Sequence, residues 1–397
     1  MTEPKLPLMS TTDPREWRRM MLEAAPRGPS VVDSDTGMIH VLRYRDIEPL
    51  LHESRVHGVG LSLFDAMDIT GGALRDWYGA LMFTNDGPPH DRLRRLVNKA
   101  FTPRAVERLR PIAADRVEEQ LAPLRTRGAG DLVGALAPLP MHVMCSLLGV
   151  PRAAVPDFIA WVDALSPVFG WMEPAQVEAA EAAIVALLGY LRDLVEERSH
   201  SSAPDLITAL IRAEHEGDRL TRDETVAMVA NLLVGGHDTT ASQIGCTLLA
   251  LLTRPEALVL VRSDPARLGS IVAETIRIEP GIPSAPRTVI APIEICGIER
   301  PAGSVIATNF LTAHRDPEIW READDFVPQR FEEPDAPRLL SFGGGPHYCL
   351  GAALARTTIE EAVRGVAALV PVLSEDPAGI EWVQVLGQSP VRLAVTV

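Results

Sequence analysis

The chain has 397 residues, of which 46% are hydrophobic, and this is enough apolar material for a large buried core. Its net charge of −15 argues against nucleic acid as a partner, because phosphate contacts need basic patches. The cysteines Cys145, Cys246, Cys296 and Cys349 form no C-x-x-C pair. Their spacing therefore argues against a disulfide framework or a structural zinc site and fits a reducing cytoplasm.

The N-terminal residues give no sign of export. Residues 1–7 lack the basic and then apolar pattern of a signal peptide. The longest uncharged stretch, 132–151, is interrupted by prolines, a histidine and a glycine, which argues against a membrane span. We therefore expect a cytoplasmic, monomeric protein without a membrane anchor. We also expect one domain over residues 1–397, with a smaller strand-containing region near the N-terminus.

Helical patterns dominate the chain. Residues 102–198 are rich in Ala, Leu, Val and Glu, with Pro and Gly at the turns between helices. Short strand-like runs occur at 38–42, 288–295, 304–309 and 392–397. The sequence therefore predicts a mainly α fold with small β-sheets.

The segment 222–254 is predicted to form one long helix. Thr221 and Glu224 have the spacing of a capping box at its start, and Pro255 follows its end. At 1.5 Å per residue this helix would be about 50 Å long, enough to cross a domain. A glycine pair at 235–236 interrupts its centre at a cost of roughly 1 kcal/mol per glycine relative to Ala. We therefore expect another backbone or a ligand to pack there.

A glycine-rich run lies at 342–351 and reads Phe-Gly-Gly-Gly-Pro-His-Tyr-Cys-Leu-Gly, with a helical pattern following from about residue 350 to 370. It places Cys349 at a helix N-terminus, where the helix dipole and free N–H groups favour a thiolate. The glycines would let a flat ligand approach the backbone closely. Such a thiolate is a candidate axial ligand for haem iron, but a buried structural cysteine explains the loop equally well.

The run resembles the haem-binding signature of the cytochrome P450 family, Phe-Gly-x-Gly-x-His-x-Cys-x-Gly. Its fixed positions correspond to Phe342, Gly343, Gly345, His347, Cys349 and Gly351. The resemblance implies the cytochrome P450 fold of the soluble bacterial members. Haem b would lie between the long helix and the cysteine loop with its following helix. Cys349 would be the axial iron ligand, and the cofactor would also contact Phe342, Gly343, His347 and Gly351.

The run Gly-Gly-His-Asp-Thr-Thr at 235–240 resembles the oxygen-activating segment of the same family, [Ala/Gly]-Gly-x-[Asp/Glu]-Thr. Cleavage of dioxygen consumes protons, which a carboxylate can relay while an alcohol provides hydrogen bonds at the oxygen site. The resemblance implies that Thr239 is this alcohol and Asp238 this relay. On the residues alone, the alternative is a threonine bonded to a helical carbonyl and a solvated aspartate.

Glu274 and Arg277 match the Glu-x-x-Arg pattern of the family, and at i, i+3 on a helix their side chains meet. A surface ion pair is the ordinary explanation of this spacing. The family combines the motif with an arginine from a Phe-x-Pro-x-Arg-Phe stretch, which is Arg330 here. The resemblance therefore implies a buried Glu274–Arg277–Arg330 network that braces the proximal side of the haem.

Residues 86–94 resemble the segment with which the family pairs haem propionates. His90 and Arg94 lie at i, i+4 on one helix face, and buried propionates need cationic donors. The segment departs from the family pattern in its entry turn but keeps the spacing of these donors. By the same resemblance, Arg287 and His347 fit the other propionate donors.

The substrate pocket of the family is built from segments that are mostly apolar here. The expected lining residues are Phe83, Phe169, Val234, Gly235, Ile282, Val385 and Leu386. Such a lining suits a hydrophobic molecule, such as a terpenoid, steroid, fatty acid or polyketide. Each of these residues could instead belong to the core.

The resemblance implies a monooxygenase that inserts one oxygen atom from O2 into a C–H bond. The chain has no flavin or nicotinamide fingerprint and no iron–sulfur cysteine set, so electrons from NAD(P)H would arrive through a ferredoxin reductase and a ferredoxin. Candidate docking contacts near the cysteine loop are Arg104, Arg338 and Arg356. Two alternatives remain open: a peroxide-driven or other non-hydroxylating haem-thiolate enzyme, and a haem-binding sensor without turnover.

Overall fold

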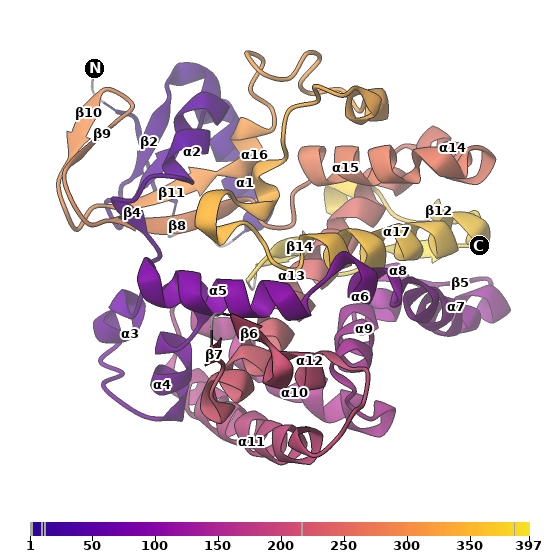
Figure 1. The fold of residues 1–397 in the computed structure, drawn as a ribbon. Helices are drawn as coiled ribbons and strands as arrows, with labels where there is room; N and C mark the ends of the chain where they lie inside the picture. The colour runs from indigo at the N-terminus through magenta and orange to yellow at the C-terminus, as the bar shows by residue number, and fades with distance from the viewer. Residues whose placement is uncertain (1–2, 9–10, 12, 216, 385) are drawn as a thin grey trace.

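The computed structural model describes residues 3–8, 11, 13–215, 217–384 and 386–397, and helices make up most of it (Figure 1). The α-helices are α1 Pro14–Ala24, α2 Tyr44–Leu50, α3 Ser62–Ala66, α4 Ala73–Gly79, α5 Pro88–Ala100, α6 Pro103–Glu107, α7 Arg110–Arg127, α8 Leu132–Leu136, α9 Leu139–Leu148, α10 Val155–Leu165, α11 Pro174–Ser199, α12 Leu206–Arg212, α13 Arg222–Leu252, α14 Pro255–Ser263, α15 Leu268–Ile278, α16 Phe310–Ala313 and α17 Ala352–Leu369. The prediction of a mainly helical fold is confirmed.

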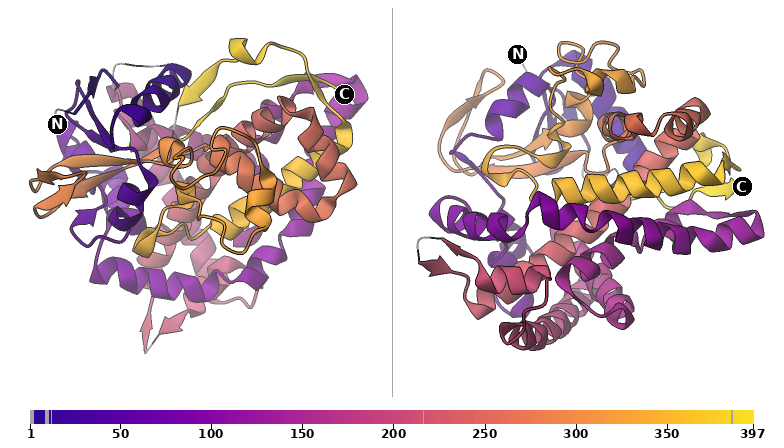
Figure 2. Two further views of the ribbon diagram at one scale, coloured as in Figure 1. Left: turned by 90° about the horizontal axis from the view of Figure 1, so that it is seen from above. Right: turned by 45° about the vertical axis from the view of Figure 1, so that its right-hand side comes forward.

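The strands form small sheets. They are β1 Lys5–Leu6, β2 Ser30–Asp33, β3 Ile39–Val41, β4 Val56–His57, β5 Ala129–Asp131, β6 Glu214–His215, β7 Asp218–Arg219, β8 Ser284–Val289, β9 Ile293–Ile295, β10 Ile298–Arg300, β11 Val305–Asn309, β12 Val372–Leu373, β13 Trp382–Gln384, β14 Gln388–Pro390 and β15 Ala394–Thr396. The largest sheet has the order β1-β2-β3-β11-β8-β4. Figure 2 shows this strand-rich part on one side of the molecule and the helices on the other.

The predicted long helix is α13, and its bounds agree with the capping signals. The Thr221 side chain accepts a hydrogen bond from the Glu224 N–H, and the Glu224 side chain accepts one from the Thr221 N–H. Most of α13 is buried, because α9, α10, α11 and α17 pack around it. The helix therefore forms the centre of the core, and a different helix packs against each of its faces.

One strand prediction was wrong in its extent. The run 288–295 is not continuous: β8 ends at Val289, and β9 begins at Ile293 and pairs with β10 in a hairpin. Pro292 stands between the two strands and has no N–H group for a sheet ladder, which explains the break. The other three predicted strands correspond to β3, β11 and β15.

The helix after the cysteine loop is α17, and it packs along α7, α13 and α15. In Figure 1, α5 and α17 pass in front of α13. This arrangement puts the cysteine loop, the start of α17 and the middle of α13 around one space. Within the described part of the chain, no single helix is both long and apolar enough to cross a membrane. Among the described helices, α13 and α14 reach that length and apolar composition only when taken together, and the chain bends by 100° between them.

Candidate active site

A cavity of about 290 Å³ lies between α5, α9, α13 and the loop that precedes α17. Residues predicted from the sequence that line it are Phe83, His90, Arg94, Gly235, Thr239, Ile282, Phe342, His347, Cys349 and Gly351. Lining residues that the sequence did not reveal include Phe101, Pro140, Val143, Met144 and Asn231. No local signal marks Pro140, Val143 and Met144, because α9 reaches the site only through the packing of helices far apart in the sequence, whereas Asn231 lies on α13 one turn before Gly235, where helix periodicity could have found it.

Two short 3₁₀ turns shape the cysteine loop, at Leu340–Phe342 and Gly345–His347. Between them Gly343 has φ +70°, a conformation that a residue with a side chain rarely adopts. The Cys349 N–H donates a hydrogen bond of 2.8 Å to the Phe342 carbonyl and closes the loop. Cys349 lies inside the protein, but its accessible surface faces the cavity that it lines, so its sulfur is open to that space.

The surroundings of Cys349 act on its thiol in opposite directions. Burial has the largest effect and raises the pKa, whereas the Gly351 N–H and the positive charges of Arg94 and Arg356 lower it. The donors near a helix N-terminus therefore favour a thiolate, as the sequence predicted, but do not outweigh burial by themselves. A coordinating metal ion would deprotonate the thiol outright.

Arg94 and Arg287 are cations without an acid at ion-pair distance among the described residues, and only the more distant charge of Asp86 acts on Arg287. Arg94 lines the cavity, and neither side chain forms an ion pair with any described residue. Burial lowers the pKa of both guanidinium groups. Because a buried cation is costly unless it is matched by an anion, both positions suit an anionic ligand. Arg287 lies on β8 and is outside the wall of the cavity itself.

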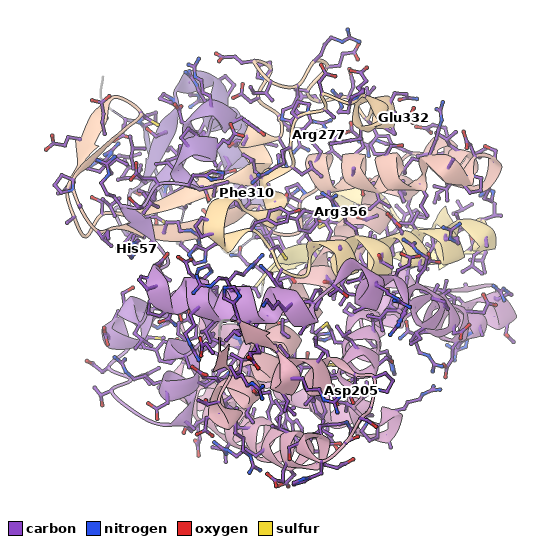
Figure 3. All side chains as sticks on the ribbon, viewed as in Figure 1. His57, Asp205, Arg277, Phe310, Glu332 and Arg356 are labelled. Atoms are coloured by element: carbon purple, nitrogen blue, oxygen red, sulfur yellow. The ribbon has the colours of Figure 1, made fainter. Side chains whose placement is uncertain are left out.

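The two predicted histidines lie together, with ring centroids 4.4 Å apart. His347 Nε2 lies 2.7 Å from Asp86 Oδ1, and His90 Nδ1 lies 3.0 Å from Asp91 Oδ1. Asp86 Oδ2 also accepts the Gly58 N–H at 3.0 Å. The sequence did not reveal the Asp86–His347 pair, because 261 residues separate its members. Figure 3 shows the neighbouring His57 at the end of β4, above the start of α5.

Only one face of α13 meets the cavity. Gly235 and Thr239 lie on that face, and the Thr239 hydroxyl donates a hydrogen bond of 2.6 Å to the Gly235 carbonyl. Val234 and Asp238, also one turn apart, lie on a different face and do not line the cavity. Val234 is 1% exposed and packs in the core, so its assignment to the pocket lining is corrected here.

Asp238 is directed toward α10 and its C-terminal end. Its Oδ2 atom accepts a hydrogen bond from the hydroxyl of Ser166, a residue that is itself buried. Burial, the largest effect, raises the pKa of Asp238, and the Ser166 hydrogen bond opposes this only in part. The carboxyl group therefore keeps its proton to a higher pH than an exposed aspartate does.

The remaining pocket predictions have mixed outcomes. Phe169 does not line the cavity but packs on Phe83, with ring centroids 5.6 Å apart, and so supports the wall from behind. Leu386 is half-buried and does not line the cavity either. Its turn follows β13, and Gly387 in that turn lies against Ser242 and Gly281, next to the lining residues Gln243 and Ile282. Val385 lies outside the described residues.

The charged network lies on the other side of the cysteine loop. Arg277 donates two hydrogen bonds of 2.8 Å to Glu274, and both side chains are 0% exposed. Arg330 Nε lies 3.3 Å from the same carboxylate. Arg277 also donates to the carbonyls of His314, Ala323 and Asp325. The helix α15 is thereby tied to the long connection that leads to the cysteine loop.

Comparison with known proteins decides what this arrangement is. The family model described as Cytochrome P450 matches residues 62–264 and 268–363. The chain belongs to the cytochrome P450 family. As a cytochrome P450 monooxygenase it is a haem-dependent oxidoreductase, and this argues against a sensor without turnover.

Bacterial members of the P450 family are similar over most of their length. The monooxygenase PikC of Streptomyces venezuelae is 37% identical over 76% of this chain and 72% of its own. The vitamin D(3) 25-hydroxylase of Pseudonocardia autotrophica is 36% identical over 70% of this chain and 67% of its own. The crystal structure of CalO2 superposes with a TM-score of 0.87 at 29% identity, over 97% of this chain and 96% of that chain.

The residues around the cavity fit the haem that the P450 family carries. Cys349 offers sulfur, Arg94 is an unpaired cation, and a Cβ atom built on Gly235 would meet nothing within 4 Å. The space above Gly235 is therefore open, as expected where a flat cofactor and a small ligand must fit, whereas the Met144 side chain packs against Gly236.

Proposed function

We propose that this chain hydroxylates a hydrophobic small molecule, with O2 as oxidant and electrons from a ferredoxin. The observation that carries the proposal is that Cys349 and Thr239 line one cavity whose remaining wall is mostly apolar. Its apolar side chains include Met82, Phe83, Val143, Met144, Ile282 and Leu354. An apolar wall with few polar groups binds an apolar substrate, and the shape of the cavity then determines how the substrate is oriented.

In this proposal Cys349 would hold the haem iron through its thiolate. Arg94, Arg287, His90 and His347 would pair with the propionates, since neither arginine has an acid at ion-pair distance in the described structure. Haem bound there supplies the electron-transfer and oxygen chemistry. The apolar wall excludes water from the reacting C–H bond and holds the substrate over the cofactor.

Thr239 and Asp238 deliver protons to the cavity in this proposal. The Thr239 hydroxyl, 2.6 Å from the Gly235 carbonyl, stands at the cavity wall and can turn to donate into the cavity. Asp238, whose pKa burial raises, can hold a proton and release it toward Thr239. This acid–alcohol pair favours reaction with O2 over the peroxide-driven alternative, because peroxide brings its own protons.

The ferredoxin would approach the outer side of the cysteine loop. Arg338 and Arg356 line a depression of about 360 Å³ between the loop, α15 and α17, and Arg104 is exposed on α6. The Arg338 side chain donates to the Gly343 carbonyl at 2.9 Å, so this cation is coupled directly to the loop. Figure 3 shows Arg356 at the face of α17 toward α15.

The test uses vitamin D3, testosterone, palmitic acid and limonene as probes. We expect at least one probe to change the spin state of the purified haem protein. With NADPH, a plant-type ferredoxin, its reductase and ¹⁸O2, that probe should gain one ¹⁸O atom, and omission of the ferredoxin should abolish product. Product from hydrogen peroxide alone, with none from the NADPH system, would instead establish the peroxide-driven alternative.

A further inference from the structure

Asp238 belongs to a cluster on the far side of α13 whose two other members have no role in the site described so far. It consists of Asp163 on α10 and the neighbours His237 and Asp238 on α13, with one ligand atom of each within 4.8 Å of the others. Figure 1 shows α10 on the side of α13 away from α17. The cluster begins with Asp163 at the protein surface and ends with Asp238, which precedes Thr239 in the sequence.

Side-chain exposure drops sharply from Asp163 to the other two members of this cluster, and Asp238 is slightly more exposed than His237. The Asp163 side chain is 62% exposed, whereas those of His237 and Asp238 are 6% and 14% exposed. An acid in contact with solvent therefore lies beside a buried imidazole, which lies beside the buried acid. This is the order of groups that a proton would need to move from water into the protein.

One ring nitrogen of His237, Nε2, lies near both acids. Its Nε2 lies 3.7 Å from Asp163 Oδ1 and 4.0 Å from Asp238 Oδ1. Its Nδ1 is buried without a hydrogen-bond partner among the described residues. With the ring hydrogen on Nδ1, Nε2 is free to accept a proton from one acid and then donate it to the other. Both distances exceed a hydrogen bond, so a small rotation of the ring selects one acid at a time.

The two oxygens of Asp238 have separate partners. Oδ2 accepts the Ser166 hydroxyl, and Oδ1 faces His237. Ser166 follows α10 directly, three residues after Asp163. One segment therefore supplies both the surface acid and the hydroxyl that binds Asp238. The Ser166 hydroxyl also lies 3.1 Å from the Val162 carbonyl, which gives it an alternative acceptor when Asp238 moves.

We propose that Asp163 and His237 form the outer half of a proton path from solvent to Asp238, and that Ser166 holds the Asp238 carboxyl group between deliveries. A proton from water binds Asp163, passes to His237 Nε2 and then to Asp238 Oδ1, which leaves Asp163 and His237 ready to be reloaded. No electron or other reactant is involved. The inference rests on the proposed role of Asp238.

The test compares His237→Phe and Asp163→Asn with the wild type. With NADPH, a plant-type ferredoxin and its reductase, we expect the rate of NADPH oxidation to fall about tenfold in His237→Phe and several-fold in Asp163→Asn. The ratio of the rates in H2O and D2O should rise in both variants, because proton delivery becomes the slow step. Oxidation of guaiacol by hydrogen peroxide should stay at the wild-type rate, since peroxide carries the protons.

Asp157→Asn is the matched control, because Asp157 is an exposed acid on the same helix α10 and does not belong to the cluster. It should leave both rates unchanged. If His237→Phe and Asp163→Asn also leave NADPH oxidation unchanged while Asp238→Asn slows it, the path is wrong and the role of Asp238 stands. If Asp238→Asn has no effect, the proposed proton relay itself fails.

A second readout is independent of turnover. In the reduced protein with bound carbon monoxide, which is diamagnetic, the ¹⁵N shifts of the His237 ring should respond to Asp163→Asn and to Asp238→Asn. They should not respond to Asp157→Asn. If the His237 ¹⁵N shifts are the same in both cluster variants as in the wild type, the path is wrong even if the rates fall, because the ring then does not interact with either acid.

Discussion

Replacing Arg277 with methionine should destabilise the protein by about 3–5 kcal/mol, because it leaves the buried Glu274 carboxylate without its main partner. Both side chains are 0% exposed, and Arg277 also donates to three backbone carbonyls, of which that of His314 is buried. Methionine fills similar space but donates nothing. The midpoint of urea unfolding, followed by circular dichroism on the haem-loaded protein, measures the loss.

The matched control is Arg19→Met, since Arg19 forms an i, i+3 pair with Glu16 in the same spacing but on the surface, with side chains 55% and 44% exposed. It should have a much smaller effect on the urea midpoint than Arg277→Met, because water screens an exposed ion pair. Equal effects of the two substitutions would mean that the network is solvated and does not brace the fold.

The effect of Arg277→Met should extend to the cysteine loop. Arg277 binds the His314 carbonyl, and the His314 ring accepts the Leu340 N–H at 2.8 Å. Leu340 begins the turn that ends at Phe342, whose carbonyl binds the Cys349 N–H. We therefore expect the variant to lose haem at a lower urea concentration than the one that unfolds its helices.

Replacing Asp238 with asparagine should slow NADPH-driven turnover by about 10²–10⁴-fold, the range for loss of a general acid–base group. Asparagine can still accept the Ser166 hydrogen bond but cannot carry a proton. Haem content and the guaiacol reaction with hydrogen peroxide should be unchanged. Stopped-flow measurement of NADPH oxidation with saturating ferredoxin checks the rate.

Asp223→Asn provides the control on the same helix, because Asp223 is exposed in the first turn of α13. We expect it to match the wild type. An Asp238→Asn variant that turns over at the wild-type rate would assign proton delivery to other groups and remove the main reason to prefer O2 over peroxide as the oxidant.

The fold was largely predictable from short-range patterns. The capping box at Thr221 and the proline after Arg254 fixed the ends of α13 to within two residues, because helix termini are set by local hydrogen bonding. The glycine-rich loop likewise identified the position of Cys349. The Glu274–Arg277–Arg330 network was predictable only through family resemblance, since its spacing alone is typical of many surface pairs.

The rest depended on packing that no local pattern encodes. Helix periodicity could have shown that Val234 and Asp238 share a face distinct from that of Gly235 and Thr239. It could not have shown that Ser166, 72 residues earlier, meets Asp238, because that contact depends on how α10 lies on α13.

The central claim is that Cys349 binds the haem iron as a thiolate. The most direct measurement is the absorption spectrum of the reduced protein with carbon monoxide, for the wild type, Cys349→Ala and Cys296→Ala. Cys296 is a half-buried cysteine in the turn between β9 and β10, remote from the cavity lining. We predict a strongly red-shifted Soret band in the wild type and Cys296→Ala and its loss in Cys349→Ala. An unshifted band in folded wild-type protein would contradict the account.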